Sequence, residues 1–440
     1  MDALLRQNQR NDEGRIMTSS LERYAVIVDP YSSGNQFAKE FAREGVRVIA
    51  VLSCVEPAQV YAASYRPQDF FRVYVAPAAD LEELVSELRD YSPICVLTGC
   101  ESGVELAERL APLLLPQTCN GLELAIARRD KGFMAAAVSA AGVPMMKQIC
   151  TDDLASVQRW RLDNGLAQRD LVVKPPKSAS TDGVTKVSTD ESLQQAFTRL
   201  LHQPNRLGII NDRVLVQEYL SGTEYVVDTF SYAGVHTLCS VCQYAKLDNV
   251  NSMAIYDRMD WVSHDDPIIE TLAGYAEQVL NALGIAWGNS HIEIMQTVDG
   301  PRLIELGARP HGGGHPSLCV KATGDSQVHR AVKYFAQGIT PSKRFYLLKH
   351  MTVVFFRALA PCIVRNLEKL HALAALRSYV DASIQVKEGQ AVPPTQDLFA
   401  TLALGFVVLA NEDRRQLAED VVAVRQAEAE VFQQGMQGVA

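Results

Sequence analysis

The feature that most constrains the fold is an alternation of short apolar runs and helical stretches near the N-terminus. Four apolar runs read as buried strands: Tyr24–Val28, Val46–Leu52, Phe71–Val75 and Ile94–Thr98. Helical patterns lie between them, among them Gln36–Glu44 and Asp80–Tyr91. Continuous apolar strands that alternate with helices are typical of parallel sheets covered on both faces. We therefore expect residues 21–118 to form a parallel α/β layer.

The rest of the chain divides by its pattern into further regions. They are a small α+β unit at 119–213, a strand-rich unit at 214–338 and another α/β piece at 339–440. The last region ends in a helix expected from Glu412 to Gln434, with Asn411 as its cap. Residues 1–20 are polar and mixed in charge, and we expect a flexible tail there. A chain of 440 residues is long enough for this multidomain α/β and α+β architecture.

Composition and charge indicate a small-molecule enzyme of the cytoplasm. Apolar residues make up 48% and charged residues 21% of the chain, as in water-soluble globular proteins. The net charge of −9, without a basic run, argues against a nucleic-acid partner. The longest apolar stretches, such as Leu110–Leu115 and Leu402–Ala410, are too short to span a membrane, and the first twenty residues lack an apolar signal core. The nine cysteines have no disulfide-type spacing, so we expect reduced thiols.

One cysteine pair, Cys239-Ser-Val-Cys242, has the spacing of a metal-binding motif. It lies in an apparent strand, where positions three apart point to opposite faces of the sheet. A zinc site would also need a second pair, and the sequence has none. We therefore interpret Cys239 and Cys242 as small buried residues.

Two segments in the strand-rich region predict a β-hairpin. His291–Met295 alternates polar and apolar residues and reads as a half-buried strand, and Leu303–Leu306 reads as a second one. Between them, Val298-Asp-Gly300 supplies the glycine that a three-residue hairpin loop favours at its last position. This loop pairs Thr297 with Pro301 and fixes the register of the hairpin.

The predicted register places Glu293 directly opposite Glu305, with side chains about 5 Å apart on one face. Two carboxylates so placed repel each other, and only Arg309 lies near them in the sequence to neutralise them. A divalent cation between them explains the arrangement, and all-oxygen ligation suits Mg²⁺, with Mn²⁺ as a substitute. The alternative is an exposed hairpin with two solvated acids.

A glycine-rich segment, Gly307–His315, follows this hairpin. The consecutive glycines leave the backbone amides of Gly312 and Gly313 open to close approach by an anion. Arg309 adds a permanent, forked positive charge. Together with the carboxylate pair, the segment predicts a site for phosphate and metal, and a flexible surface loop is the alternative.

Two histidines are candidates for substrate contact. His291 lies on the same strand face as Glu293 by alternation, but a hydrogen-bonded structural histidine fits equally well. His264 ends the stretch Asn251–His264, which we interpret as a long polar and aromatic connection beside a substrate pocket. A plain surface loop is the alternative for this stretch.

Candidate phosphate-binding residues lie upstream. Lys174 ends an apolar strand, where a lysine is buried at a cost unless it meets an anion. The following loop, Ser178–Val184, is rich in hydroxyl groups and contains Gly183, as flaps that cover phosphates do. It is not a Walker A sequence. Lys131 follows Asp130 at a helix start, where an ordinary surface lysine is the alternative.

A further strand, Val214–Tyr219, leads into a turn that ends at Glu224. Backbone groups at such an edge can read an adenine, and a glutamate beyond it can bind ribose hydroxyls. This segment completes a set of candidates for a nucleotide site.

Taken together, these segments resemble the ATP-grasp superfamily. The matching motifs occur in the expected order: Asp130-Lys131, Val173-Lys174-Pro175, Ser178–Val184, Gln217–Leu220, Gly222-Thr-Glu224 and Glu293…Glu305…Arg309. The resemblance covers the chain from about Tyr24 to the C-terminus. It implies an ATP-grasp fold in which residues 119–213 are the small, lid subdomain and residues 214–338 the large one, between an N-terminal α/β domain and a C-terminal extension.

The resemblance also implies a role for each matching residue. The nucleotide-binding residues are Lys131, Lys174, Ser178, Ser180, Thr181, Gly183, Val184, Gln217, Glu218, Tyr219, Leu220 and Glu224. The metal ligands are Glu293 and Glu305. Arg309 is the catalytic residue, which steadies the transferred phosphate. Substrate contacts come from Arg309, Gly312, Gly313, His291 and His264.

Two positions depart from the family pattern. The family often places asparagine two positions after the second carboxylate, where this chain has Gly307, so one metal ligand is missing or is replaced by water. Ser180 stands in the flap where glycine is common, which predicts a stiffer flap.

Within the superfamily the chain looks most like bacterial L-amino acid ligases. The cues are Thr98-Gly-Cys-Glu-Ser-Gly-Val104, the phrase Asn120…Arg129-Asp-Lys131 and the overall length. Members of that group often serve peptide-antibiotic pathways. The resemblance therefore implies that ATP and Mg²⁺ activate one amino acid as an acyl phosphate, which the amine of a second amino acid attacks to give a dipeptide, ADP and phosphate.

Other functions also fit the sequence. The same fold serves ligases that use bicarbonate, an amino sugar, a polyamine or a peptide end. A nucleotide-binding protein without turnover is a second alternative, which the missing asparagine favours. A nicotinamide oxidoreductase is a poor third, because the GxGxxG fingerprint is absent. The amino acids joined and the oligomeric state stay undetermined, with a homodimer among the alternatives.

Overall fold

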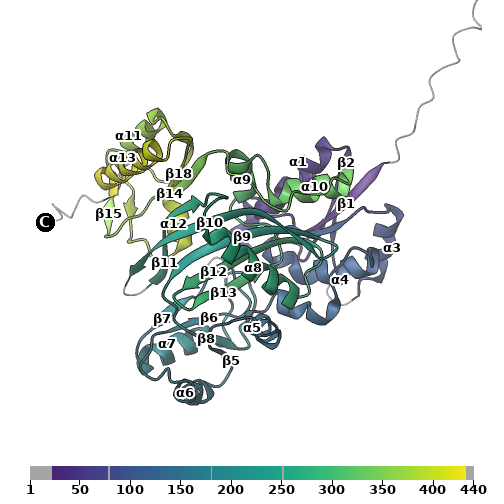
Figure 1. Cartoon of the computed structure of the whole chain (residues 1–440), viewed down its shortest axis with the longest axis horizontal. Coiled ribbons are helices and arrows are strands. Elements are labelled where there is room, and N and C mark those ends of the chain that lie inside the picture. The colour runs from purple at the N-terminus through teal and green to yellow at the C-terminus, as the bar shows by residue number, and fades with distance from the viewer. Residues whose placement is uncertain (1–21, 78–79, 180, 250–251, 433–440) are drawn as a thin grey trace, which may run out of the picture.

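The computed structural model describes residues 22–77, 80–179, 181–249 and 252–432 (Figure 1). The expected tail at residues 1–20 and the flap residue Ser180 lie outside these ranges. Within them, no helix combines the length and the apolar character that crossing a membrane requires.

The N-terminal unit is a parallel sheet covered by helices, as predicted. Its strand order is β3-β2-β1-β4, and all three neighbouring pairs are parallel. The strands are β1 Arg23–Val28, β2 Val46–Leu52, β3 Arg72–Val75 and β4 Val96–Thr98. The helices are α1 Gln36–Arg43, α2 Gln59–Ala62, α3 Glu82–Asp90 and α4 Val104–Leu114. Successive residues of β1 enter two different cores: Ile27 packs with Phe37 of α1, and Val28 packs with Leu84 of α3.

The next unit is a small antiparallel sheet with order β5-β8-β6-β7. Its strands are β5 Gln148–Thr151, β6 Leu171–Lys174, β7 Thr185–Val187 and β8 Val214–Glu218. Three helices belong to this part of the chain: α5 Lys131–Ala140, α6 Leu154–Asp163 and α7 Asp190–Leu200. Because β8 pairs with β5 and β6, this sheet continues past the boundary predicted at residue 213.

The centre of the molecule is an eight-stranded sheet with order β13-β12-β9-β10-β11-β14-β18-β16. Its strands are β9 Thr223–Tyr232, β10 Val235–Asn249, β11 Ser252–Trp261, β12 Gly288–Thr297, β13 Gly300–Gly307, β14 His350–Phe355, β16 Tyr379–Ile384 and β18 Gly405–Asn411. A minor sheet pairs β15 Cys362–Ile363 with β17 Ala391–Val392. The central sheet therefore runs without a break across the boundary predicted at residue 338.

The expected connection Asn251–His264 is wrong, because most of this stretch is strand β11. It pairs antiparallel with β10 and with β14. The stretch reads as polar because its charged side chains are paired on the folded strand: Arg258 Nε lies 2.9 Å from Asp260, and Asp257 accepts a hydrogen bond of 2.6 Å from Arg425. The partner Arg425 is far away in the chain, so it is not visible from local sequence.

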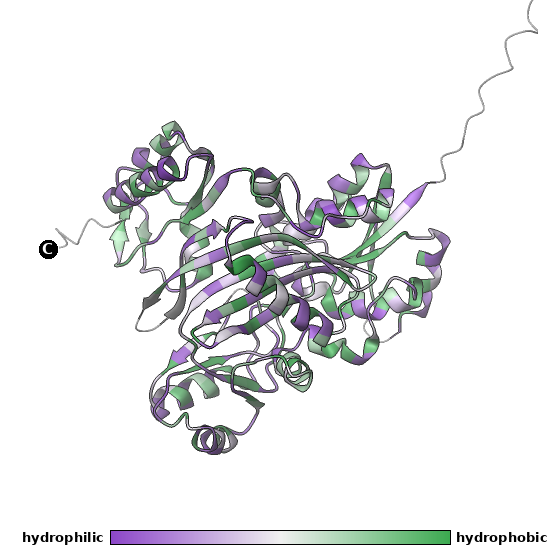
Figure 2. Ribbon diagram, in the orientation of Figure 1, coloured by the Kyte–Doolittle hydropathy of each residue, from purple (hydrophilic) through white to green (hydrophobic). Residues whose placement is uncertain are grey.

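Helices cover the central sheet on the outside. They are α8 Ile268–Ala282, α9 His315–Thr323, α10 Gln327–Gln337, α11 Glu368–Ala372, α12 Leu398–Leu404 and α13 Arg414–Phe432. Figure 2 shows hydrophilic and hydrophobic residues alternating around the outer helices, as expected of amphipathic helices over a sheet. The C-terminal helix starts two residues later than predicted. Asp413 caps it by accepting from the Arg415 amide at 2.8 Å, and Asn411 instead accepts from the Asp413 amide.

The cysteine pair on β10 behaves as the sequence predicts. Cys239 packs in the core that contains Phe230 and Val328, whereas Cys242 packs in the core that contains Met351. The two side chains therefore lie on opposite faces of the sheet. All nine cysteines of the chain are free thiols.

Candidate functional site

The two acids of the hairpin face each other as predicted, but by a different route. Glu293 on β12 is paired with Glu305 on β13. The turn is one residue tighter than expected, because Thr297 pairs with Gly300 instead of Pro301. A bulge at Ile304 then shifts the register back before the acids are reached. The error in the predicted turn and the unpredicted bulge cancel each other.

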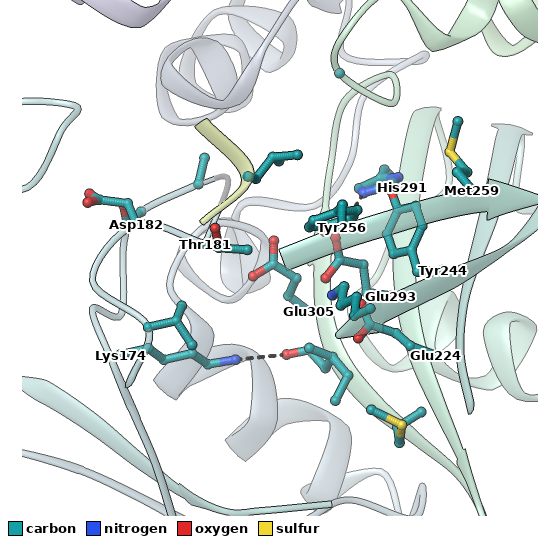
Figure 3. Close-up of a pocket in the computed structure, with 18 of the residues that line it drawn as sticks. Lys174, Thr181, Asp182, Glu224, Tyr244, Tyr256, Met259, His291, Glu293 and Glu305 are labelled. Atoms are coloured by element: carbon teal, nitrogen blue, oxygen red, sulfur yellow. Dashed lines mark hydrogen bonds and ion pairs between the residues drawn. The ribbon is translucent and has the colours of Figure 1, made fainter. Parts of the chain in front are cut away.

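The bulge at Ile304 brings a backbone carbonyl to the first of two lysines. Lys174, at the end of β6, is 4% exposed and donates to the Ile304 carbonyl at 3.3 Å (Figure 3). Lys131 enters from the start of α5, with its Nζ 3.2 Å from Glu305 Oε2 and 2.9 Å from the Ser178 carbonyl. Three segments that are distant in sequence thus place two buried ammonium groups beside the carboxylate pair.

Lys131 is fixed by the cap of its helix. The Asp130 side chain accepts from the amides of Gly132 and Phe133 at 2.8 and 3.2 Å. It also receives a hydrogen bond from Arg213 at 2.8 Å. A capped and charge-paired first turn holds the residue that follows the cap in one position.

The surroundings of the pocket keep Glu293 ionised and lower the pKa of Lys174. Burial raises the pKa of Glu293, but the hydrogen bond from His291 and the charges of Lys246 and His291 outweigh it and bring this pKa to about 2. Burial lowers the pKa of Lys174 to about 8, although Glu305 acts in the opposite sense. An added anion near Lys174 would restore its charge, which fits a lysine that meets phosphate.

The hairpin carboxylates fit a divalent cation by their chemistry. Glu293 is kept as a carboxylate by its surroundings, and Glu305 faces it from the neighbouring strand. The donors are all oxygen, the set preferred by Mg²⁺ and Mn²⁺. Magnesium in such a position supplies charge neutralisation for the oxygens of a transferred phosphate. Glu293 and Glu305 are therefore the residues that would hold the metal.

The structure explains why glycine replaces asparagine at position 307. A Cβ atom there would lie 3.2 Å from the Arg309 guanidinium and 3.2 Å from the Glu101 carboxylate. Arg309 Nε donates to Glu101 Oε2 at 3.0 Å, and Arg129 lies 3.2 Å from the other oxygen. The space of the usual asparagine is filled by this Arg309–Glu101 pair, which joins the N-terminal sheet to the site.

The predicted anion site at the glycine amides is wrong for Gly313. Its amide donates to Ser32 Oγ at 3.1 Å, and the Gly314 amide donates to Ser33 Oγ at 3.0 Å. The three glycines instead dock against the loop after β1, with Gly313 and Gly314 at positive φ values of 63° and 76°. Gly312 and Gly313 still line the pocket beside Arg309.

The flap residues lie over the same pocket. Ser178, Thr181 and Val184 line it, together with Asp182. Ser178 Oγ donates to Asp182 at 2.8 Å, which closes the loop on itself. Thr181 has a positive φ of 61°, and its buried hydroxyl has no hydrogen-bond partner among the described residues. An unpaired buried hydroxyl that lines a pocket fits a loop that closes on a phosphate.

The predicted hinge lies at the end of β8, an inner strand of the small sheet, and lines the pocket with Gln217, Glu218, Tyr219 and Leu220. The side chains of the first two are engaged inside that sheet: Gln217 donates to Gln148, and Glu218 accepts from the Lys147 amide at 2.8 Å. Recognition of a base by this segment would therefore fall to its backbone.

Sequence reasoning missed Lys246, which lies in the pocket on β10. Its Nζ is 2.6 Å from Glu224, the predicted ribose ligand. Burial raises the pKa of Glu224 above its usual range, although the charge of Lys246 opposes this shift. The apparent strand of the Cys239–Cys242 pair is part of β10, which continues to Asn249. Continuing the alternation beyond Cys242 would have placed Tyr244 and Lys246 on one face.

The two predicted histidines have different outcomes. His291 lines the pocket, with Nε2 3.3 Å from Glu293 and Nδ1 3.1 Å from Asp228. His264 is wrong as a substrate contact, because it packs outside the pocket: its Nδ1 accepts from the Leu347 amide at 3.1 Å and its ring lies against Tyr346. Strand β11 forms in place of the expected loop, and His264, which follows this strand, lies outside the pocket.

The geometry defines a nucleotide-type site between a small and a large sheet, and comparison with known proteins identifies its class. Residues 167–317 match the family described as the ATP-grasp domain. These residues include Lys174, the flap, the hinge, both acids and Arg309. The chain therefore contains an ATP-grasp domain and has the ATP-grasp fold.

The chain is also similar to individual proteins over nearly its whole length. The chain is 27% identical over 416 residues to dapdiamide A synthase of Enterobacter agglomerans, covering 93% of this chain and 97% of that protein. Its fold is similar to L-amino acid ligase from Bacillus licheniformis, with a TM-score of 0.69 at 15% identity, covering 94% and 98% of the two chains. It is also similar to N5-carboxyaminoimidazole ribonucleotide synthetase from Thermotoga maritima, with a TM-score of 0.63 at 16% identity, covering 92% and 98%. These findings support ATP-dependent ligation and leave the substrates open.

Proposed function

We propose that this protein is an L-amino acid ligase, which joins two L-amino acids into a dipeptide at the expense of ATP. The observation that carries the proposal is the convergence of Glu293 and Glu305 with Lys131, Lys174 and Arg309 in one buried pocket. The two lysines and Arg309 stabilise negative charge on a phosphate, and the two carboxylates would bind the metal ion that accompanies it.

In this proposal ATP lies between the small and the large sheet. The adenine contacts the backbone from Gln217 to Leu220, and the ribose contacts Glu224. The phosphates lie between Lys131 and Lys174, under the flap Ser178–Val184. Both lysines are held by backbone carbonyls, at 2.9 and 3.3 Å, and those carbonyls orient them before a nucleotide arrives. Orientation in advance reduces the entropy cost of binding.

The first chemical step transfers the γ-phosphate to the carboxylate of one amino acid. Lys131 and Lys174 spread the charge that develops on the transferred group, and Arg309 holds the acyl phosphate that results. Arg309 retains its Nε hydrogen bond to Glu101, so its guanidinium is fixed from the N-terminal side. Closure of the flap excludes water, which would otherwise hydrolyse the intermediate.

The amino-acid preference in the proposal comes from the other end of the pocket. That end is apolar and is lined from β11, β14, α9, α12 and β18 by Met259, Leu318, Val353, Phe355, Leu398, Leu402 and Phe406. These residues suit an apolar side chain. A ribonucleotide substrate, as in the Thermotoga neighbour's name, would need a second phosphate site, and these lining residues include no cation.

The proposal is tested by a pairwise screen of amino acids with ATP and Mg²⁺, which measures ADP formation and the mass of the product. We expect ADP and dipeptide to form together, and most strongly for pairs that contain an apolar residue. ADP formation with a bicarbonate, amino-sugar or polyamine acceptor instead would assign another ligase activity. ATP binding without ADP formation on the whole panel would mean a nucleotide-binding protein without turnover.

The proposal also covers, in outline, the pathway in which the protein acts. The relative from Enterobacter agglomerans is named a dapdiamide A synthase, and by analogy we propose that the product serves antibiotic biosynthesis. Amino acids, as small-molecule substrates, are the proposed partners of the pocket. A gene-deletion strain analysed for missing peptide products would test the pathway.

A further inference from the structure

One arginine of the small unit, Arg206, contacts both the flap and the C-terminal unit. It lies in the loop between α7 and β8. Its Nη2 donates to Asp397 Oδ2 at 3.2 Å, and its Nε lies 3.6 Å from Asp182 Oδ1. The Cζ of this guanidinium also lies 4.2 Å from the centroid of the Phe399 ring. Two acids from different units thus share one cation, and without it they would repel each other.

The partners of Arg206 in the C-terminal unit belong to a helix that lines the pocket. Asp397 is the N-cap of α12, where its side chain accepts from the Ala400 amide at 2.8 Å. Leu398 and Leu402 lie one turn apart on this helix and line the apolar end of the pocket. Leu402 is 37% exposed, so part of its apolar surface is open to a substrate side chain. The position of α12 therefore depends both on Arg206 and on the side chain that fills this end of the pocket.

On its other side, Arg206 is connected to a phosphate lysine by hydrogen bonds. The Arg206 amide donates to Asp182 Oδ2 at 2.8 Å, and the same oxygen accepts from Ser178 Oγ at 2.8 Å. The Ser178 carbonyl in turn accepts from Lys131 Nζ at 2.9 Å. The Asp182 carboxylate points away from Glu305 in Figure 3, so it serves to hold the flap and not to bind the metal. This series of hydrogen bonds leads from Arg206 to an ammonium group that would meet the nucleotide.

The loop that carries Arg206 is held in one conformation by its neighbour Asn205. The Asn205 side chain accepts from the amides of Leu207 and Ile209 at 2.9 and 3.2 Å. Its Nδ2 donates to the Lys177 carbonyl at 2.8 Å, next to the start of the flap. A side chain that closes a loop on its own backbone in this way fixes the residues around it. A shift of α12 would therefore move the flap instead of being absorbed by the loop.

We propose that Arg206 is a positioning residue that couples the amino-acid end of the pocket to the ATP end. The inference rests on the proposed ligase function. An apolar amino acid that packs on Leu398 and Leu402 favours the position of α12 in which Asp397 binds the guanidinium. Arg206 then holds Lys131, through the hydrogen bonds above, in the position that meets phosphate. The amino acid thereby raises the affinity for ATP, and ATP raises the affinity for the amino acid by the same factor.

The alternative is an ordinary surface ion pair, because the Arg206 side chain is 43% exposed. A single exposed pair contributes little to stability. Arg206 differs from such a pair because one guanidinium has two carboxylates and an aromatic ring as partners, and all three lie on segments that reach the pocket. An exposed ion pair and an exposed ring contact together account for a coupling of roughly 5- to 10-fold.

Nucleotide binding, measured with and without an amino acid, tests the coupling. Titration calorimetry gives the Kd of the unreactive ATP analogue AMP-PNP with Mg²⁺, alone and with saturating L-leucine, L-methionine or L-phenylalanine. For the unchanged protein we expect at least one of these amino acids to lower the Kd by roughly 5- to 10-fold. In Arg206→Met this enhancement should disappear, while the Kd of AMP-PNP alone stays close to that of the unchanged protein.

Two further variants separate coupling from stability. Asp397→Asn keeps a good N-cap residue on α12 but removes the carboxylate, so it should lose most of the enhancement although the helix is retained. Arg199→Met is the matched control. Arg199 is an exposed arginine of α7 that donates to Thr185 Oγ1 at 2.7 Å within the small unit, so this variant should keep the full enhancement.

An equal rise of the Kd with and without amino acid in Arg206→Met would overturn the inference, because it indicates a purely structural role. An enhancement that Arg206→Met retains would overturn it as well. So would an unchanged protein in which none of these amino acids alters the Kd although dipeptides form. If the unchanged protein forms no ADP with any amino-acid pair, the proposed function itself fails and the inference fails with it.

Discussion

At Gly307 the backbone passes close to Arg309 and Glu101, so that a Cβ atom would lie 3.2 Å from both side chains and they would have to shift slightly. The family often has asparagine at this position, two residues after the second carboxylate. In this chain the Arg309–Glu101 ion pair lies there instead and connects the site to the N-terminal unit. The arginine proposed to hold the acyl phosphate depends on that contact.

We predict that Gly307→Asn impairs the ligase without preventing ATP binding. The new Cβ atom would approach the Arg309 guanidinium and the Glu101 carboxylate to 3.2 Å and push the pair apart. Dipeptide formation should fall by roughly 10- to 100-fold, as expected when a positioned charge is displaced. Nucleotide binding by calorimetry, measured alongside turnover, separates the two effects, and unchanged turnover would contradict the role given to Arg309.

At the scale of elements, the flap depends on the backbone conformation of Gly183. Its φ is +70°, and a Cβ atom there would meet Leu200 at 2.8 Å and Pro175 at 3.1 Å. Gly183→Ala therefore both strains the backbone and moves the flap, and we predict a higher KM for ATP. Gly208→Ala is the matched control, since Gly208 has a φ of +78° and an added Cβ atom would meet no other atom within 4 Å. It should cost about 1–2 kcal/mol of stability and leave the KM unchanged.

The elements also show which parts of the fold local sequence encodes. Strand β2 has the predicted bounds, and β6 ends at Lys174 as predicted, because each is a short apolar run that ends at a break. Strand β11 does not follow from local sequence, because its Asp257 is paired with Arg357, after β14, and with Arg425 of α13, both far away in the chain. The bulge at Ile304 was also missed, because it is set by the tertiary environment, where Lys174 contacts its carbonyl.

The same limit applies to the candidate site. The lysines, the acids and Arg309 stand in motifs that local sequence carries, and the structure brings these predicted residues into one pocket. Lys246 and Asp228 lie on strands β10 and β9, and only strand pairing brings them to the site. His311 stands in the glycine-rich segment, but its contacts with Asp228 and Tyr244 form only in the folded chain. The assignment of free amides to Gly313 failed because its partner, Ser32, lies in a different unit of the molecule.

At the scale of the whole molecule, the N-terminal sheet is joined to the rest by buried ions. Arg128 is fully buried, and its Nε donates to Glu108 of α4 at 2.7 Å while Nη1 donates to the Leu283 carbonyl at 2.9 Å. These contacts link α4, the segment before α5 and the end of α8. The continuous central sheet and this ion pair favour unfolding of the joined units in one step.

We predict that Arg128→Met lowers the free energy of unfolding by about 3–5 kcal/mol, because Glu108 is left as an unpaired buried charge. Urea denaturation followed by fluorescence and by circular dichroism measures this loss. Arg344→Met is the control, since the pair between Arg344 and Glu270 is exposed and such pairs contribute little. A similar, small effect for both variants would contradict the structural role given to Arg128.

The central claim, that two facing carboxylates bind the metal of an ATP-dependent ligase, is tested most directly by ADP formation in Glu305→Gln. The control is Asp299→Asn, the same change of acid to amide at an exposed position of the hairpin turn. We predict Mg²⁺-dependent, amino-acid-dependent ADP formation that EDTA abolishes in the unchanged protein, that Asp299→Asn retains and that Glu305→Gln loses by at least about 100-fold. Turnover by Glu305→Gln equal to that of the control would contradict the account.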